Sequence, residues 1–448
     1  APWQVLQRSW TVSPPVKSGR FVVEMNKTHG TAWVDDLSII AVKGPAGKGG
    51  KPGGEVAIAS PALGNLFSPG DPLTFTVRVK GGAGATAENE VLTYEVRDFW
   101  GQRYSPQDAA PVPLKAETRT GDARGGIDLG DLDLEEGVYY ELHGTTASGI
   151  QGAASFAILP RSRTFDYPAE DIPFGTQGFT WRSSSAQTLG ARLGARWSRG
   201  RLSNWDLHLN DPSWQAMHVT NFTSRGLIPY MYVDLGHNWE RGKLGDDLGV
   251  LVEGLPAFVG HYAAEGLDTY KLGNEPPGWK PEQVEQAVAG YRVLYEGIKR
   301  EDPDARVISS SINNNHERFM KAGAGLYCDF VDFHVYLPLA EQRRLTRDMQ
   351  DWIEEYSPGK PLWCTELGSN GFSLGRHQRA IDTVAKHVAI LADGVSRVDW
   401  FCLQGFAADE DNYMGAYAML NPDGTPRFDA ISYFHLLDLL TVKGFRQE

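Results

Sequence analysis

The chain has 448 residues, enough for two or three domains, and its 41% hydrophobic and 22% charged residues are ordinary for a globular protein. A formal net charge of −13 disfavours nucleic acid and an anionic membrane surface as partners, since both attract basic proteins, and it also disfavours a polyanionic substrate. No apolar run reaches the roughly 18 residues that a membrane-spanning helix needs.

Residues 1–43 contain short β-rich runs and no helical pattern. Trp33–Ile39 resembles the last strand of carbohydrate-binding β-sandwich modules, so this segment is either the end of such a module or a strand pair docked on the next domain. Residues 44–54 have the Gly/Pro composition of a linker. The chain starts with Ala1 rather than Met, and we expect a secreted, periplasmic or cell-surface protein whose leader is not present in this chain.

Residues 55–160 alternate apolar and polar side chains, which predicts strands rather than helices. The alternating runs are Leu73–Lys80, Val91–Val96, Ile127–Leu134, Val138–Leu142 and Ala154–Leu159, and Gly-rich turns separate them. This spacing predicts an immunoglobulin-like β-sandwich with a spacer or binding role.

Residues 161–448 change to strands that alternate with helical stretches, which is typical of a (β/α)8 TIM barrel. The strand candidates are Gly178–Trp181, Ala195–Arg199, Ile228–Val233, Tyr270–Gly273, Val307–Ser311, Val331–Tyr336, Leu362–Thr365 and Val398–Leu403. The clearest helices are predicted at Pro281–Arg300, Gln378–Leu391 and Ala430–Leu440, where apolar residues recur with helical spacing.

Two glutamates follow predicted barrel strands. Glu275 ends the fourth strand, within Asn274-Glu275-Pro276, and Glu366 ends the seventh. A single Glu after a strand is more often a surface group, but two at the C-terminal mouth of one barrel form the pair that glycosidic bond cleavage needs. The acid of this pair must be protonated at working pH, so we expect the nearby charge of ionised Glu366 to raise the pKa of Glu275.

The motifs around these glutamates resemble those of the clan of retaining (β/α)8-barrel glycoside hydrolases. The resemblance implies that Glu275 is the acid/base, that Asn274 contacts the 2-hydroxyl of the sugar, and that Glu366 is the nucleophile. It also implies that His334 and Tyr336, a His-x-Tyr pair on the sixth strand, support the nucleophile.

The resemblance extends to the second and eighth strands. It implies that Arg199 lies near the nucleophile, although Arg196 and Arg201 compete for this role, and that Trp400 forms the floor of the sugar site, unless it is barrel core. The segment Leu193–Trp205 is most similar to the β-xylosidase, iduronidase and exopolysaccharide endoglycosidase family. Ser309–Asn315 on the fifth strand departs from that family's pattern.

Three further residues are predicted on the rim of the mouth as substrate contacts: His237, Trp239 and Trp279. The His residues show no His-Glu-x-x-His motif, and no glycine-rich phosphate loop follows a strand, so we expect neither a metal nor a nucleotide cofactor. The three cysteines, Cys328, Cys364 and Cys402, are too few for a disulfide framework, and Cys364 and Cys402 lie on predicted buried strands, where we expect buried thiols.

The sequence therefore predicts a retaining glycosidase that cleaves β-linked, mostly neutral polysaccharide or oligosaccharide. The alternatives are a non-catalytic carbohydrate-binding protein on the same barrel and a transglycosylase, which would share the covalent intermediate.

Overall fold

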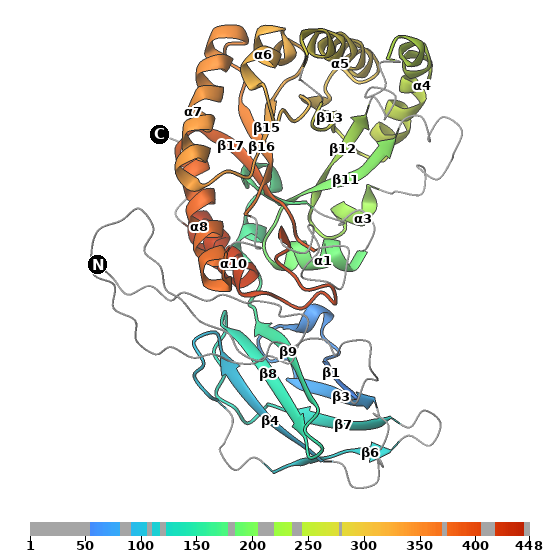
Figure 1. The fold of residues 1–448 in the computed structure, drawn as a ribbon. Coiled ribbons are helices and arrows are strands. Elements are labelled where there is room, and N and C mark those ends of the chain that lie inside the picture. Colours follow the sequence, from blue (N-terminus) through green and yellow to red (C-terminus); the bar gives the residue numbers. More distant parts are fainter. Residues whose placement is uncertain are drawn as a thin grey trace, which may run out of the picture.

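The computed structural model describes residues 54–80, 91–104, 110–116, 122–177, 184–204, 219–234, 244–276, 280–369, 374–404 and 417–442. These residues form an N-terminal pair of sheets and a C-terminal barrel (Figure 1), which confirms the predicted fold class. The predicted segment 1–43, all but the last residue of the linker 44–54, and the predicted strand Gly178–Trp181 lie outside the described residues.

The N-terminal sheets pack face to face as a sandwich. One has the strand order β1-β3-β7-β6 and the other β2-β9-β8-β4-β5. The strands are β1 (Glu55–Ala59), β2 (Leu66–Phe67), β3 (Thr74–Lys80), β4 (Val91–Asp98), β5 (Val112–Pro113), β6 (Lys115–Ala116), β7 (Ala123–Asp128), β8 (Tyr139–Thr146) and β9 (Gln151–Ile158). Phe75 and Val77 on β3 are buried while Thr76 between them is exposed, as the alternating pattern predicts.

The predicted strand Ile127–Leu134 is wrong after its second residue. β7 ends at Asp128, whose carboxylate accepts a hydrogen bond from the backbone N–H of Gly130 (2.9 Å). This side chain replaces a ladder partner and turns the chain. The apolar residues that follow, Leu132 and Leu134, pack against the sandwich core from a loop.

The barrel contains eight parallel strands in the order β14-β13-β12-β11-β10-β17-β16-β15. They are β10 (Phe174–Thr176), β11 (Trp197–Asn204), β12 (Ile228–Asp234), β13 (Thr269–Leu272), β14 (Arg306–Ile308), β15 (Val331–Val335), β16 (Leu362–Leu367) and β17 (Val395–Trp400). Parallel bridges from Ile308 to Phe330 and from Ile312 to Phe333 join the two end strands and close the ring.

Helices cover the outside of the barrel (Figure 1). They are α1 (Ser184–Arg192), α3 (Thr220–Thr223), α4 (Leu244–Ala264), α5 (Pro281–Glu301), α6 (His316–Lys321), α7 (Leu339–Tyr356), α8 (Arg376–Ala392) and α10 (Phe428–Val442), with short 3₁₀ turns η1 (Leu63–Asn65), η2 (Arg163–Asp166), η3 (Ala169–Asp171) and η5 (Ala324–Leu326). The three helices predicted most clearly correspond to α5, α8 and α10.

The floor of the barrel is filled by aromatic side chains. Trp197, Tyr230, Ile308 and Trp363 form one buried cluster at the N-terminal part of the strands. The Arg397 guanidinium lies 3.2 Å from the centroid of Trp197 and 4.5 Å from that of Trp363. These side chains fill this part of the barrel interior, so we expect a substrate to bind at the C-terminal mouth.

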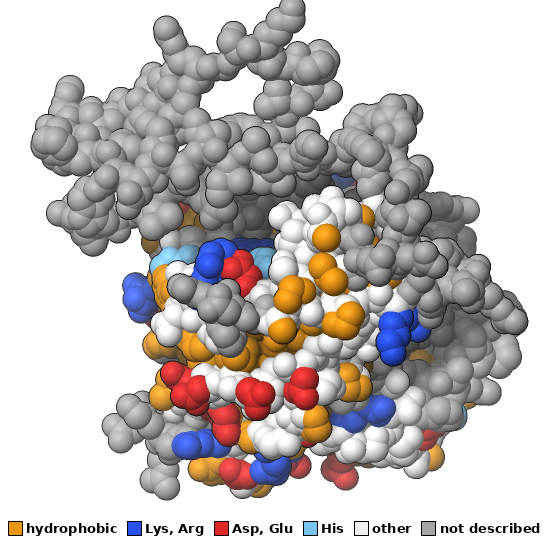
Figure 2. Space-filling model, turned by 90° about the horizontal axis from the view of Figure 1, so that it is seen from below, with side chains coloured by type: hydrophobic (Ala, Val, Ile, Leu, Met, Phe, Trp, Pro, Cys, Tyr) orange, Lys and Arg blue, Asp and Glu red, His pale blue; other side chains and the backbone are white. Residues whose placement is uncertain are grey.

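The sandwich docks against the barrel through helices α8 and α10 and the segment that precedes α10. Phe99 stacks on Phe428 with centroids 3.6 Å apart, and the Ser155 hydroxyl donates to the backbone oxygen of Pro426 (2.6 Å). Arg376 pairs with Glu141 (2.6 Å) across the same boundary. Seen from the sandwich side (Figure 2), acidic side chains form a row across the described part of the surface.

All three cysteines are buried and free, which confirms the prediction for Cys364 and Cys402. Within the described ranges, no helix combines the length and the hydropathy that membrane crossing requires.

Candidate active site

The two predicted glutamates meet at the mouth of the barrel. Glu275 follows β13, Glu366 lies near the end of β16, and a carboxylate oxygen of each lies within 4.8 Å of the other. The side chain of Glu366 is 7% exposed, whereas about a third (34%) of the Glu275 side chain is exposed. The Glu366 carboxylate is therefore held inside the protein. The Glu275 carboxylate lies nearer to solvent, on the side toward which a leaving group would depart.

A β-bulge aims Glu366 into the barrel. On the partner strand β15, Phe333 pairs with Cys364 but the next residue, His334, pairs with Glu366, so Thr365 is the extra residue. The bulge turns both Thr365 and Glu366 inward, where strict alternation would have sent one of them outward. Arg199 then donates to one oxygen of Glu366 (2.9 Å), and the Tyr336 hydroxyl donates to the other.

Arg199 is buried and lies between Glu366 and Tyr232. Burial alone would lower the pKa of Arg199, but Tyr232 and Glu366 outweigh it and raise the pKa, so the guanidinium stays charged. The competing Arg196 donates to the backbone oxygens of Gly226 (2.9 Å) and Tyr167 (3.2 Å), away from both glutamates. The side chain of Arg201 lies outside the described residues.

The backbone at Glu275 is left-handed. Gly273 has φ 71° and Glu275 has φ 46°, a conformation that costs a residue with a Cβ about 1–2 kcal/mol. The Glu275 N–H donates to the backbone oxygen of Ser311 (3.0 Å), which holds the turn. Such strain is common where a site fixes a side chain in a demanding position. Here it turns the carboxylate from the strand end toward Glu366.

His334 lies between the two carboxylates. Its Nδ1 is 2.8 Å from one oxygen of Glu275 and 3.3 Å from one oxygen of Glu366, and its side chain is fully buried. Burial raises the pKa of Glu275, but the hydrogen bond from His334, together with the charge of Lys271 and a hydrogen bond from Asn313, outweighs burial and lowers the pKa. The prediction of a raised pKa for Glu275 is therefore wrong. The hydrogen-bond donors that surround this carboxylate could not be placed from the sequence.

Asn274 is oriented by Tyr232. The Tyr232 hydroxyl donates to the amide oxygen of Asn274 (2.7 Å), which directs the amide N–H₂ group away from Tyr232. The Arg199 guanidinium donates to the same hydroxyl. One hydrogen-bonded chain therefore connects Glu366 to Asn274 across strands β16, β11, β12 and β13.

Trp400 does not line the mouth, so its predicted place at the floor of the sugar site is wrong. It is 1% exposed and stacks on His387 of α8, with centroids 5.2 Å apart. The strand alternates here: Arg397 and Asp399 face inward, and Val398 and Trp400 face the helices. The next inward residue is Phe401, whose ring packs against that of Tyr336 (5.8 Å).

The three predicted rim residues, His237, Trp239 and Trp279, lie outside the described residues and stay predictions.

Sequence reasoning missed the group beneath the glutamates. Lys271 on β13 and Asp332 on β15 form an ion pair (2.8 Å), and both side chains are fully buried. Lys271 also contacts Thr365 and lies 3.4 Å from Nε2 of His334. A signal was present, because Lys271 interrupts an apolar strand at two-residue spacing from Gly273 and Glu275, which places it on the inward face.

Glu275, His334 and Glu366 could together offer three ligand atoms to a metal ion. The arrangement disfavours a cation, however. Both oxygens of Glu366 already accept hydrogen bonds, and the charged Arg199 and Lys271 lie close by. A divalent ion would have to overcome this positive charge.

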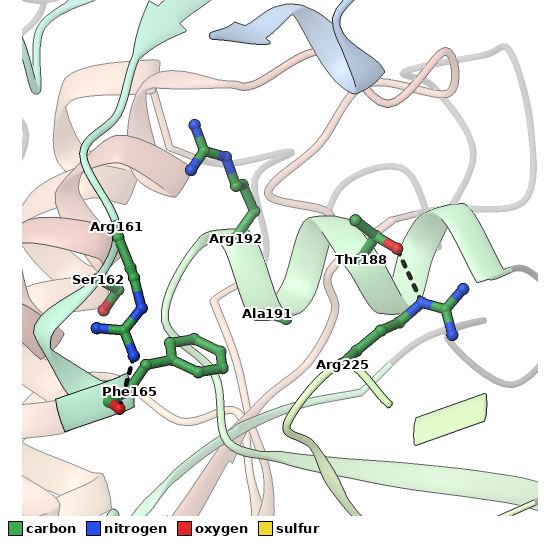
Figure 3. A pocket seen from close by; sticks show the side chains of 7 residues that line it. All are labelled: Arg161, Ser162, Phe165, Thr188, Ala191, Arg192 and Arg225. Atoms are coloured by element: carbon green, nitrogen blue, oxygen red, sulfur yellow. Dashed lines mark hydrogen bonds between the residues drawn. The ribbon is translucent and has the colours of Figure 1, made fainter. Parts of the chain in front are cut away.

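A hollow separate from the glutamates lies between the η2 region, α1 and the turn after α3 (Figure 3). It is lined by Arg161, Ser162, Phe165, Thr188, Ala191, Arg192 and Arg225. Its guanidinium groups do not converge: Arg225 donates to Thr188 (2.9 Å), while Arg192 donates to the backbone oxygens of Phe67 and Leu159 (both 2.9 Å). The mouth with the paired glutamates therefore remains the candidate active site.

Comparison with known proteins agrees with this placement. Residues 274–432, which begin at Asn274 and include Glu366, match the family model described as "Glycosyl hydrolase catalytic core". No sequence among the curated proteins matches the chain.

Three solved structures resemble the whole arrangement or the barrel. A family 39 glycoside hydrolase from Bacteroides cellulosilyticus WH2 has 17% identity and a TM-score of 0.61, covering 86% of this chain and 83% of that one. A GH5_18 protein from Streptomyces cattleya, in complex with GlcNAc, has 16% identity and a TM-score of 0.51, covering 59% and 79%. A GH5_18 protein from Bifidobacterium longum subsp. longum ATCC 55813 has 13% identity and a TM-score of 0.51, covering 62% and 80%.

The fold is that of the (β/α)8-barrel glycoside hydrolases. The resemblance noted in the sequence is thereby confirmed at the level of the clan. The family match over the part of the chain that carries both glutamates supports glycoside hydrolysis as its activity, with a carbohydrate as its substrate.

Proposed function

We propose that the protein is a retaining glycoside hydrolase that cleaves β-glycosidic bonds by double displacement. The observation that carries the proposal is the approach of the two carboxylates, since one oxygen of Glu275 lies within 4.8 Å of one oxygen of Glu366. Retaining enzymes place their carboxyl groups about 5–5.5 Å apart, whereas inverting enzymes leave roughly 6.5–9.5 Å for a water molecule. The spacing here favours direct attack by a carboxylate over attack by water.

In the first step the ionised Glu366 attacks the anomeric carbon while Glu275 gives its proton to the departing glycosidic oxygen. The C–O bond to the leaving group breaks, and an ester bond to Glu366 forms. Arg199 and Tyr336 hold Glu366 in its attacking orientation. In the second step Glu275, now ionised, takes a proton from water, and the resulting hydroxide displaces Glu366 with a second inversion, giving net retention.

The donors around Glu275 suit its ionised form. His334 and Asn313 both lower its pKa, so they stabilise the carboxylate that forms as the proton leaves and that acts as base in the second step. Asn274, held by Tyr232, has its amide donor end available for a sugar hydroxyl. A carbohydrate-binding protein would not need this set of supports for two reactive carboxylates.

We further propose a mostly neutral glycan as the substrate. The net charge of −13 disfavours acidic sugars, and the cations beside the site already pair with protein carboxylates, Arg199 with Glu366 and Lys271 with Asp332. A polymeric substrate would place the protein outside the cytoplasm, in agreement with the expected secreted, periplasmic or cell-surface location.

The proposal is tested with a panel of aryl β-glycosides and neutral polysaccharides, using Glu366→Ala as the comparison. We expect the parent to release products of retained configuration. Azide should restore turnover of an activated glycoside by the variant and give the glycosyl azide of inverted configuration. Equal activity of parent and variant would refute the role of Glu366. Transfer of the glycosyl group to sugars in preference to water would identify a transglycosylase instead.

A further inference from the structure

Beneath the paired glutamates lies a buried cation that the double-displacement mechanism does not use. The Nζ of Lys271 pairs with Asp332 (2.8 Å) and contacts Thr365, and it lies 3.4 Å from both the Tyr232 hydroxyl and Nε2 of His334. Two ions that are fully buried cost several kcal/mol each in lost hydration, which a merely structural role could avoid with apolar side chains. The arrangement therefore calls for a functional explanation.

The two ring nitrogens of His334 face opposite charges. Nε2 faces the Lys271 ammonium, which can donate hydrogen bonds but cannot accept them. Nδ1 faces carboxylate oxygens of Glu275 (2.8 Å) and Glu366 (3.3 Å), which are acceptors when ionised. The charged or titratable groups around the ring are Glu275, Glu366, Lys271, Asp332 and His316. Their placement favours a lone pair on Nε2 and a proton on Nδ1.

The remaining neighbour of Nε2 agrees with this assignment. The Thr365 hydroxyl lies 3.2 Å from Nε2 and can donate to it or to Asp332 (2.7 Å). Lys271 and the Thr365 hydroxyl reach the same oxygen of Asp332, so this carboxylate keeps its contact with Lys271 when the hydroxyl donates to Nε2 instead. Neither the ammonium nor this hydroxyl requires a proton on Nε2.

We propose that Lys271 is a positioning residue that fixes His334 as the Nδ1–H tautomer and thereby tunes Glu275 as the acid/base. A proton on Nδ1 donates to the Glu275 carboxylate and stabilises it as the proton leaves for the glycosidic oxygen. The other neutral tautomer would present a lone pair to that carboxylate and oppose its formation. This inference rests on the proposed function, in which Glu275 is the proton donor.

The test combines a spectroscopic measurement with a kinetic one. In protein labelled with ¹⁵N-histidine, the His334 signals, assigned with His334→Gln, should show a protonated Nδ1 and an unprotonated Nε2. In Lys271→Met this pattern should change, and the basic limb of kcat/KM on an aryl glycoside should move up by about one pH unit, as expected when a nearby opposite charge stops favouring an ionised carboxyl. Turnover should fall most for substrates with poor leaving groups, which depend on the acid.

Two further variants serve as controls for effects that come only from a loss of stability. Lys271→Met/Asp332→Asn removes both charges, so it leaves no unpaired ion and should show the same tautomer change and pH shift if the single variant fails to fold. Arg379→Met/Asp429→Asn removes another buried pair, which joins α8 to the start of α10, and should lower stability without moving the basic limb.

Unchanged ¹⁵N signals and an unmoved basic limb in both Lys271 variants would overturn the inference. A parent His334 protonated on Nε2 would overturn it as well. A parent protein without activity on any glycoside would refute the proposed function. The ¹⁵N measurement would still show which nitrogen of His334 is unprotonated and whether this depends on Lys271.

Discussion

The hydrogen bond from His334 to Glu275 yields a prediction about pH dependence. Burial raises the pKa of Glu275, and His334 is the strongest of the groups that oppose it. His334→Leu removes the donor and leaves burial dominant, so the pKa of Glu275 should rise. A hydrogen bond to a charged group contributes about 1.5–3 kcal/mol, and one pKa unit corresponds to about 1.4 kcal/mol, so the rise should be about 1–2 units.

The assay is the pH dependence of kcat/KM, whose basic limb reports the proton on the acid of the free enzyme. In the parent this limb should lie on the acidic side, because the pKa of Glu275 is lowered. It should move to higher pH in His334→Leu. His334→Asn, whose amide nitrogen stands the same number of bonds from Cβ as Nδ1, should restore most of the parent profile. A basic limb that stays in place in His334→Leu, or moves down, would refute the reasoning.

Three other changes separate the roles of neighbouring residues. Arg199→Met leaves Glu366 buried without its cation, so the free energy of unfolding measured with urea should fall by about 3–5 kcal/mol; Arg199→Lys, which keeps the charge, should lose less, and equal losses would contradict the ion-pair account. Burial raises the pKa of Asp399 to about 6, so the folded protein holds this proton more tightly than the unfolded chain does. The resulting contribution to stability is fully present below the unfolded pKa near 4 and is lost as pH rises through 6. Asp399→Asn should therefore stabilise the protein at pH 7 by at most about 3 kcal/mol, with no gain at pH 3. Trp400→Ala should lower the free energy of unfolding by about 3–5 kcal/mol and leave KM nearly unchanged, whereas Phe401→Ala should raise KM. A raised KM in Trp400→Ala alone would instead indicate that Trp400 contacts the substrate.

Most barrel strands were predictable because each is a short apolar run bounded by turn residues, but β10 (Phe174–Thr176) was not predicted. The ends of β12, β13, β15 and β16 lie within two residues of the predicted ends. Their parallel arrangement then places the ends of β13 and β16 at one mouth, so Glu275 and Glu366 could be paired without coordinates. Arg199, His334 and Tyr336 were assigned from the motifs that resemble those of the clan.

Two kinds of feature could not be predicted in this way. The resemblance placed Trp400 at the sugar site, but side chains alternate along β17, so Trp400 faces the helices and the next residue, Phe401, packs against Tyr336. The buried pair of Lys271 and Asp332 was missed because it joins strands far apart in sequence, and charged residues are rarely expected in a barrel core. The lowered pKa of Glu275 depends on these same contacts between strands.

The most direct test of the paired-glutamate mechanism is covalent trapping. The protein would be incubated with a 2-deoxy-2-fluoro-glycoside carrying a good leaving group, and its intact mass and proteolytic peptides would be measured. We predict a mass increase of one fluoroglycosyl unit, located on Glu366 and absent from Glu366→Ala. An adduct on any other residue, or products of inverted configuration from an active protein that forms no adduct, would contradict the mechanism.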